Sequence, residues 1–168
     1  MERLSGFVQP YAWGSATAIP TFLGRVPDGD PFAELWFGTH PAAPSPLASG
    51  AALRERVAAD PEGMLGRSVL AAFGASLPYL VKLIAPAAPL SLQVHPSLEQ
   101  ARAGFAREEA DGVPVAAPHR TYRDANHKPE MVYALTPFEA VAGFRTPRRA
   151  AELLAWLDTA LAWDLFAD

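Results

Sequence analysis

The sequence predicts one packed domain built from short strands and helices that are joined by rigid turns. Half of the 168 residues are apolar, which is enough for a core in a chain of ordinary domain length. Proline occurs 17 times, which is roughly twice its usual share of ~5%. Because proline fixes φ and removes a backbone donor, this density argues against a mostly helical bundle.

Composition also excludes several classes of protein. The net charge is -4 and no Lys/Arg cluster occurs, so the chain lacks the basic face that a nucleic-acid binder needs. The longest apolar stretch, residues 77–92, contains Lys82 and three prolines, which is incompatible with a membrane span of ~20 apolar residues. No signal peptide is recognisable, and the absence of cysteine excludes disulfides and thiolate sites. We therefore expect a cytoplasmic protein without nucleic-acid or membrane partners.

The first half of the chain predicts a strand, a loop and a helical region. Phe32, Leu35 and Trp36 suggest a strand after the turn signal at residues 28–31. Three prolines make residues 41–46 an extended loop, because a residue that precedes proline is pushed out of the helical region. Residues 49–73 are then helical in pattern, with Ser49 as a cap and with breaks at Gly63, Gly66 and Gly74.

Two apolar runs in the middle of the chain predict strands. Residues 77–84 have the length and β-branched content of a buried strand, with Lys82 as the one misfit. Residues 89–95 alternate strictly between apolar and polar side chains. In a strand this period directs Ser91, Gln93 and His95 to one face.

The second half begins and ends with a predicted helix. Ser97 and Gln100 form a capping box, which predicts an amphipathic helix over residues 97–109. A loop follows over residues 111–128, and two strands are expected at residues 130–135 and 138–144. The pair Thr146 and Pro147 opens a last helix, whose apolar side comprises Ala150, Leu153, Leu154, Leu157 and Leu161.

The residues alone suggest a metal site. Gln93 and His95 point the same way on the predicted strand, and Glu130 begins a later strand from which it supplies a third ligand. Imidazole, carboxylate and amide donors without sulfur suit zinc, manganese or cobalt. The alternative is a strand with one polar face exposed to water. His119 and His127, in the loop, are more typical of solvated side chains than of ligands.

Several motifs resemble, in the same order along the chain, those of the type I mannose-6-phosphate isomerases (phosphomannose isomerases). The similarity extends over about residues 6–147. The segments that carry it are Tyr11-Ala-Trp-Gly-Ser15, Ala33-Glu-Leu-Trp-Phe-Gly-Thr-His-Pro41, Leu77-Pro-Tyr-Leu-Val-Lys-Leu83, Pro89-Leu-Ser-Leu-Gln-Val-His-Pro96, residues 97–106, Asn126-His-Lys-Pro-Glu-Met131 and Leu135-Thr-Pro-Phe-Glu-Ala140.

The resemblance implies a mainly β fold, a cupin (jelly-roll) β-sandwich with a few short helices and with one Zn²⁺ per chain in its barrel; another divalent metal is left open. Residues 1–146 would form the cupin metal-binding domain. Residues 147–168 would begin the helical segment of the family. Family members are generally longer, so the chain is expected to be C-terminally truncated relative to them.

The resemblance also assigns roles to eight residues of the chain. Both lysines, Lys82 and Lys128, fall inside its motifs. A snorkelling lysine at a strand edge is the alternative for Lys82. The family's metal ligands correspond to Gln93, His95 and Glu130, its sugar-phosphate contacts to Trp13, Glu34, Lys82 and Ser91, and a catalytic group to Lys128.

The function that the resemblance implies is a metal-dependent aldose–ketose isomerase that interconverts mannose 6-phosphate and fructose 6-phosphate. The family takes a fourth metal ligand, a histidine, and a catalytic arginine from a later region that has no counterpart here. The alternative is therefore a non-catalytic metal-binding cupin, such as a sugar-phosphate sensor or an incomplete isomerase fragment. Uncovered sheet edges and an apolar helix face predict a homodimer or a partner subunit.

Overall fold

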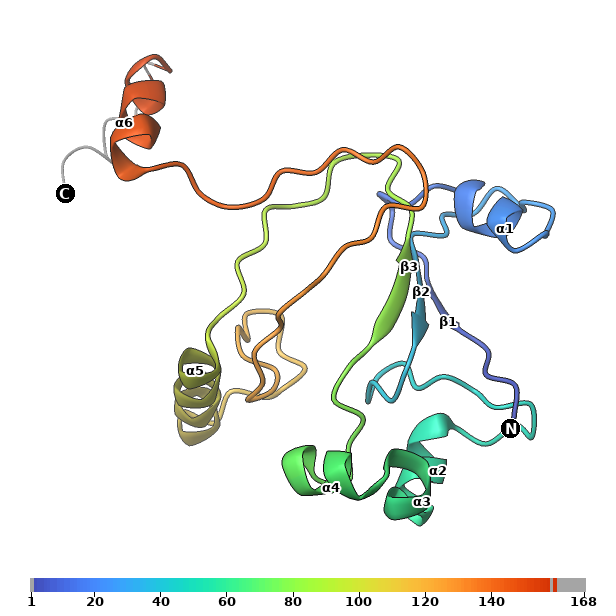
Figure 1. Ribbon diagram of the computed structural model, residues 1–168. Coiled ribbons are helices and arrows are strands. Elements are labelled where there is room, and N and C mark those ends of the chain that lie inside the picture. The colour runs from blue at the N-terminus through green and yellow to red at the C-terminus, as the bar shows by residue number, and fades with distance from the viewer. Residues whose placement is uncertain (1, 158, 160–168) are drawn as a thin grey trace. The chain divides into compact units, whose positions relative to one another are not determined.

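The computed structural model describes residues 2–157 and 159, and the chain divides into two compact units, Met1–Val94 and His95–Asp168 (Figure 1). The first unit contains a three-stranded antiparallel sheet and four short helices, and the second contains two described helices. The elements of the first unit are β1 (Phe7–Gln9), α1 (Ala18–Phe22), β2 (Glu34–Phe37), α2 (Leu53–Ala59), α3 (Pro61–Leu65), α4 (Arg67–Phe73) and β3 (Val81–Ile84), and those of the second are α5 (Leu98–Ala110) and α6 (Pro147–Ala155).

The sheet has the order β1-β2-β3, so β2 pairs with a neighbour on each side (Figure 1). Its register places Trp36 opposite both Phe7 and Lys82. Ala33 and Leu35 are buried, and together with Trp36 they form the centre of the core of this unit. The strand that was expected around Trp36 is confirmed, whereas the run at residues 77–84 forms a strand only in its second half.

The helical region after β2 is confirmed, but its first cap is not the predicted one. Ala52, rather than Ser49, precedes α2, and its amide donates to the carboxylate of Glu55. The amide of Ser49 donates instead to Glu2, 47 residues away in sequence, which commits Ser49 to a long-range contact. Gly66 separates α3 from α4 at φ 78, a left-handed conformation that glycine adopts without strain.

The two predicted helices of the second unit are confirmed. Ser97 accepts a hydrogen bond from the amide of Gln100, while the Gln100 side chain accepts from the amide of Ser97, so the capping box of α5 is formed. Thr146 caps α6 by accepting from the amide of Arg149. Of the residues that were expected on its apolar side, Leu157 lies beyond the end of α6 at Ala155 and is 61% exposed, and Leu161 lies outside the described residues.

Three predicted strands, at residues 89–95, 130–135 and 138–144, are wrong for this structure. The segments belong to no helix or strand, and many of their apolar side chains are exposed, Met131 and Val141 to more than nine-tenths. Alternating polarity indicates which faces side chains prefer, but a strand also needs a hydrogen-bonded partner for its backbone. Within the described residues, only β1, β2 and β3 find such partners as strands.

No described helix is long and apolar enough to cross a lipid bilayer. The architecture is thus a small antiparallel sheet with short helices in the first unit, and a long helix with extended connections in the second.

Candidate functional site

Glu34, Trp36 and Lys82 form a polar cluster on the sheet of the first unit. Glu34 and Trp36 are two residues apart in β2, so they share a face, and the β2–β3 register places Lys82 beside Trp36. The indole Nε1 of Trp36 donates to Glu34 Oε2 over 2.7 Å. Lys82 Nζ lies 3.9 Å from the same carboxylate oxygen and 4.7 Å from the centroid of the Trp36 ring.

The two charges of this cluster differ in their access to solvent. The Glu34 side chain is 8% exposed, whereas that of Lys82 is 34% exposed. A buried carboxylate needs partners to offset its desolvation, and here the Trp36 N–H and the Lys82 ammonium provide them. The ammonium group therefore has a fixed anchor on one side and water, or an incoming anion, on the other.

Tyr11 and Trp13 stack with their ring centroids 5.5 Å apart. Burial raises the pKa of the Tyr11 hydroxyl, and the negative charge of Glu34 raises it further, so Tyr11 lies within the electrostatic reach of the Glu34 cluster. The carbonyl oxygen of Trp13 accepts hydrogen bonds from the amides of Ala87 and Ala88. These bonds tie the segment that carries Trp13 to the residues that follow β3.

His95 and Glu130 are brought together in the second unit. His95 Nε2 lies 3.7 Å from Glu130 Oε2, and their side chains are 33% and 56% exposed. Nearby in sequence, Lys128 Nζ lies 4.0 Å from Asp124 Oδ2, four residues earlier. Two of the predicted metal ligands thus face each other, and the predicted catalytic lysine is paired with a carboxylate.

The pair of His95 and Glu130 fits a zinc ion in donor chemistry and in spacing. Zinc–ligand distances of about 2.0–2.2 Å at a tetrahedral angle separate two ligand atoms by about 3.4 Å. The observed 3.7 Å is close to that separation and is too long for a direct hydrogen bond. Among the described residues, no three histidine or carboxylate side chains gather as a metal site. The amide of Gln93 as a third ligand stays a prediction.

The remaining predicted residues, Ser91 and Gln93, lie exposed in the extended segment that ends the first unit. This segment is not a strand, so strand periodicity does not support a shared direction for Gln93 and His95, and the role of Gln93 as a ligand stays a prediction. The loop residues His119 and His127 are exposed as well.

Two contributors to the Glu34 cluster, Tyr11 and Trp36, were not singled out from the sequence, although both lie in its motifs. The spacing of Trp36 from Glu34 was a usable signal, since residues i and i+2 of a strand share a face. The raised pKa of Tyr11 depends on its burial and on the nearby Glu34 carboxylate, which no local pattern encodes.

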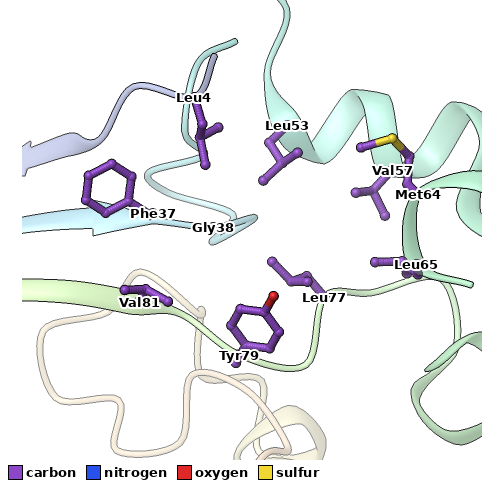
Figure 2. Close-up of a pocket in the computed structure, with 10 residues that line it drawn as sticks. All are labelled: Leu4, Phe37, Gly38, Leu53, Val57, Met64, Leu65, Leu77, Tyr79 and Val81. Atoms are coloured by element: carbon purple, nitrogen blue, oxygen red, sulfur yellow. The ribbon is translucent and has the colours of Figure 1, made fainter. Parts of the chain in front are cut away.

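A pocket of about 330 Å³ lies elsewhere in the first unit, where the end of the sheet meets α2 and α3 (Figure 2). Its lining offers one polar side-chain group, the Tyr79 hydroxyl, and no charge, so it lacks the groups that a phosphate needs. The lining residues are Leu4, Phe37, Gly38, Leu53, Val57, Met64, Leu65, Leu77, Tyr79 and Val81.

Comparison with known protein families gives one match that covers most of the chain. The sequence model described as "Phosphomannose isomerase type I, catalytic domain" matches residues 1–147. The mannose-6-phosphate isomerase of Escherichia coli (strain K12) is 44% identical over 159 residues, which cover 92% of this chain. That of Homo sapiens is 36% identical over 156 residues, which cover 84% of this chain.

A solved structure is similar as well. The crystal structure of mannose 6-phosphate isomerase from Salmonella typhimurium, bound to its substrate fructose 6-phosphate and to zinc, superimposes with a TM-score of 0.70 at 43% identity, over 76% of this chain. The matched part is 33% of that chain, and 40% of the Escherichia coli protein and 34% of the human one. The present chain therefore spans well under half the length of these relatives.

Proposed function

The chain belongs to the type I phosphomannose isomerase family. On that premise we propose that it acts as a metal-dependent isomerase that interconverts mannose 6-phosphate and fructose 6-phosphate. The observation that carries the proposal is the approach of His95 to Glu130, within 3.7 Å, at positions that the sequence motifs had already marked as ligands. We assign zinc to Gln93, His95 and Glu130.

The proposed reaction moves hydrogen without a net change in oxidation state. The hydrogen on C2 of the aldose leaves as a proton, C1 gains a proton, and a hydroxyl proton passes from O2 to O1 through an enediol-like intermediate. Zinc, when bound, supplies fixed positive charge beside the sugar oxygens, where negative charge develops. The remaining tasks fall to side chains of the protein, which bind the phosphate and move protons.

Lys82 suits the phosphate, because its ammonium is anchored by Glu34 and Trp36 and stays partly exposed. Its charge can meet a phosphate oxygen in a charge-assisted hydrogen bond, to which Ser91 would add a hydroxyl. Trp13, stacked on Tyr11, offers an apolar ring face to the sugar. We assign these residues, with Glu34, to substrate binding.

Lys128 is the proposed catalytic group near the sugar oxygens. Its ammonium lies 4.0 Å from Asp124 Oδ2 while its side chain remains 56% exposed. The carboxylate limits the positions that the flexible lysine samples, and the exposure leaves a donor free for a substrate oxygen. In this role Lys128 donates a proton to, or shares one with, the oxygen of the enediol.

We propose a cupin (jelly-roll) β-sandwich over residues 1–146, of which the three-stranded sheet is one part, followed by a helical segment. Exposed apolar side chains of residues 130–144, among them Met131, Val141 and Phe144, support a homodimer or a partner subunit that covers them. Sedimentation of a stable monomer at micromolar concentration would argue against this assembly. The cytoplasmic location stays a prediction.

The deciding experiment couples the formation of fructose 6-phosphate to a visible readout, with and without chelator, beside elemental analysis of the purified chain. We expect one zinc per chain and chelator-sensitive turnover. His95→Ala should lose both, whereas His119→Ala, in the exposed loop, should keep both. Bound metal without turnover would favour a non-catalytic metal-binding cupin. A chain that shows no bound metal and no turnover would refute the proposal.

A further inference from the structure

We propose that Arg120 is a positioning residue that sets the separation of His95 and Glu130. The inference rests on the proposed function, in which these two side chains are zinc ligands. Arg120 touches neither of them. It acts through the path of the chain between them, by holding the loop after α5 against the C-terminal half of that helix (Figure 1).

The buried Arg120 is the centre of a network, here named the Arg120 clip, formed with Glu108, Glu109, Val113 and Tyr122. Its side chain is 0% exposed. Nε donates to the carbonyl of Tyr122 over 2.8 Å and lies 3.3 Å from Glu108 Oε2, and Nη1 donates to the carbonyl of Val113. Nη2 lies 2.7 Å from Glu109 Oε1, in an ion pair whose angle falls outside hydrogen-bond geometry.

The helix side of the clip also binds the loop directly. The Glu108 carboxylate accepts hydrogen bonds from the amides of Thr121 and Tyr122 over 2.9 and 2.7 Å. The Arg120 guanidinium stacks over Phe105 of α5 at 5.0 Å. Gly104 leaves room for the Tyr122 ring, since a Cβ built there would lie 2.4 Å from Tyr122 Cε2. Helix and loop are therefore joined by charge, hydrogen bonds and close packing.

These contacts shorten the free path between the proposed ligands. His95 lies two residues before Ser97, the cap of α5, so the helix fixes the chain that follows it. At the far end of α5 the clip holds the loop as far as Tyr122. Of the residues between His95 and Glu130, only 123–129 then lack a restraint from the helix or the clip.

The size of the effect follows from loop-closure entropy. The probability that two chain positions meet falls with the three-halves power of the number of free residues between them. With α5 intact, the residues between the helix and Glu130 are 111–129, which number 19, and the clip leaves residues 123–129 free, which number 7. The clip therefore raises the chance that Glu130 meets His95 roughly fourfold. A metal that needs both ligands should bind more tightly by the same factor.

The test is the zinc affinity of Arg120→Met, measured by competition with a chromophoric chelator. Methionine keeps an unbranched apolar chain that reaches about as far as Nε, and it removes the charge and the five donors of the guanidinium. We expect zinc binding about fourfold weaker than in the parent chain. Arg120→Lys should recover only part of the loss, because an ammonium cannot serve two carboxylates and two carbonyls in a planar fork. Arg102→Met, exposed on the same helix, is the matched control and should bind zinc normally.

A metal-free readout separates this inference from the proposed function. The chain has no cysteine, so Glu99→Cys at the exposed start of α5 accepts a single nitroxide label. The label should broaden the Glu130 amide resonance when Arg120 is intact, and it should do so much less in Arg120→Met. Circular dichroism should show that α5 is unchanged in the variant. Gly104→Ala, which displaces Tyr122 without removing a charge, should act in the same direction if Arg120→Met fails to fold.

The outcomes are distinct. A parent chain without zinc affinity refutes the proposed function, whereas the broadening of Glu130 still decides the role of Arg120. Equal broadening and equal zinc affinity in the parent chain and in Arg120→Met would overturn the positioning role.

Discussion

The two units hold their candidate residues in different ways. In the first, Glu34 and Lys82 lie on paired strands, whose backbone hydrogen bonds fix the register whatever the side chains are. In the second, His95 and Glu130 lie outside regular structure, and the Arg120 clip restrains the chain between them through side chains. A single side-chain substitution should therefore disturb the second arrangement more than the first.

The two units also differ in how many apolar residues they bury. Ile19, Ala33, Leu35, Leu47 and Val57 are buried apolar residues of the first unit, whereas Ala101 is the one such residue described in the second. With little apolar burial there, the fully buried Arg120 and its carboxylates carry a larger share of the packing. Charged partners also make this unit sensitive to pH.

The largest expected effect is a loss of stability in the first unit, where paired strands hold the candidate residues. A Cβ at Gly14 would lie 2.4 Å from the Cα and Cβ of the buried Ala33, where the backbone itself must move. We expect Gly14→Ala to lower the free energy of unfolding by about 3 kcal/mol, as measured by chemical denaturation. Gly38→Ala is the control, because its Cβ first meets a terminal methyl of Leu80 at 2.8 Å, which can move. Equal losses of unfolding free energy in Gly14→Ala and Gly38→Ala would contradict the role of the backbone contact.

The next effect concerns Trp36 and Glu34. Trp36→Phe keeps a ring under Lys82 but removes the N–H that donates to the buried Glu34 carboxylate. Leaving a buried acceptor short of a donor should cost about 2 kcal/mol in unfolding free energy. Adding Glu34→Gln should remove much of that penalty, since a neutral amide is cheaper to bury than an unpaired charge. A double-mutant cycle with no coupling would contradict the assigned contact.

A smaller effect is expected from Gly104→Ala in α5. Replacing glycine by alanine inside a helix ordinarily stabilises it by about 1 kcal/mol. Here the new methyl displaces the Tyr122 ring, so we expect a net loss of about 1 kcal/mol instead. In the background of Arg120→Met, where the loop is already released, the same change should be neutral or stabilising. Thermal unfolding of the four proteins in the cycle measures this difference.

The smallest effect is a pH dependence of the clip. The backbone hydrogen bond from Thr121 lowers the pKa of Glu108 below its ordinary value of 4.5, and the Tyr122 amide and the positive charges of Arg120 and Arg107 lower it further. A lowered pKa means that the stabilisation is complete above pH 4.5 and is lost as the pH falls through the pKa of the folded state.

Amide chemical shifts of Thr121 and Tyr122 should therefore stay constant above pH 4.5 and change together below it. Glu108→Gln should abolish the shared change. Glu2→Gln is the matched control, because Glu2 also has a lowered pKa, through hydrogen bonds from Ser49, but lies in the first unit. If Glu2→Gln also altered the change in the Thr121 and Tyr122 amide shifts, the two units would be coupled in acid.

Local sequence signals predicted the helices well. The capping box at Ser97 and Gln100 and the Thr146-Pro147 start are short-range hydrogen-bonding patterns, and α5 and α6 begin where they indicate. The strands at residues 89–95, 130–135 and 138–144 were wrong because pairing depends on partners distant in sequence, which an apolar pattern does not reveal. Ser49 failed as a cap for the same kind of reason, since Glu2, which is distant in sequence, binds both its amide and its side chain.

For the candidate site, the motifs predicted which residues to examine but not how they are held. The pairs Glu34 with Lys82 and His95 with Glu130 join residues that the sequence had singled out separately. Arg120 carried no local signal. Its importance comes from its burial between a helix and a loop and from its contacts with two carboxylates and two carbonyls.

The β2–β3 register also bears on which changes in chain length the molecule tolerates. Residues 38–80, which contain α2, α3 and α4, leave the sheet after Phe37 and return to it at Val81. Insertions or deletions in residues 38–80 should leave Lys82 opposite Trp36, because the register of the strand pair and not the loop length places these residues together. Removing one residue within β3 would instead turn Lys82 to the opposite face of the sheet. The length of the chain between these strands can thus change while Lys82 stays beside the indole.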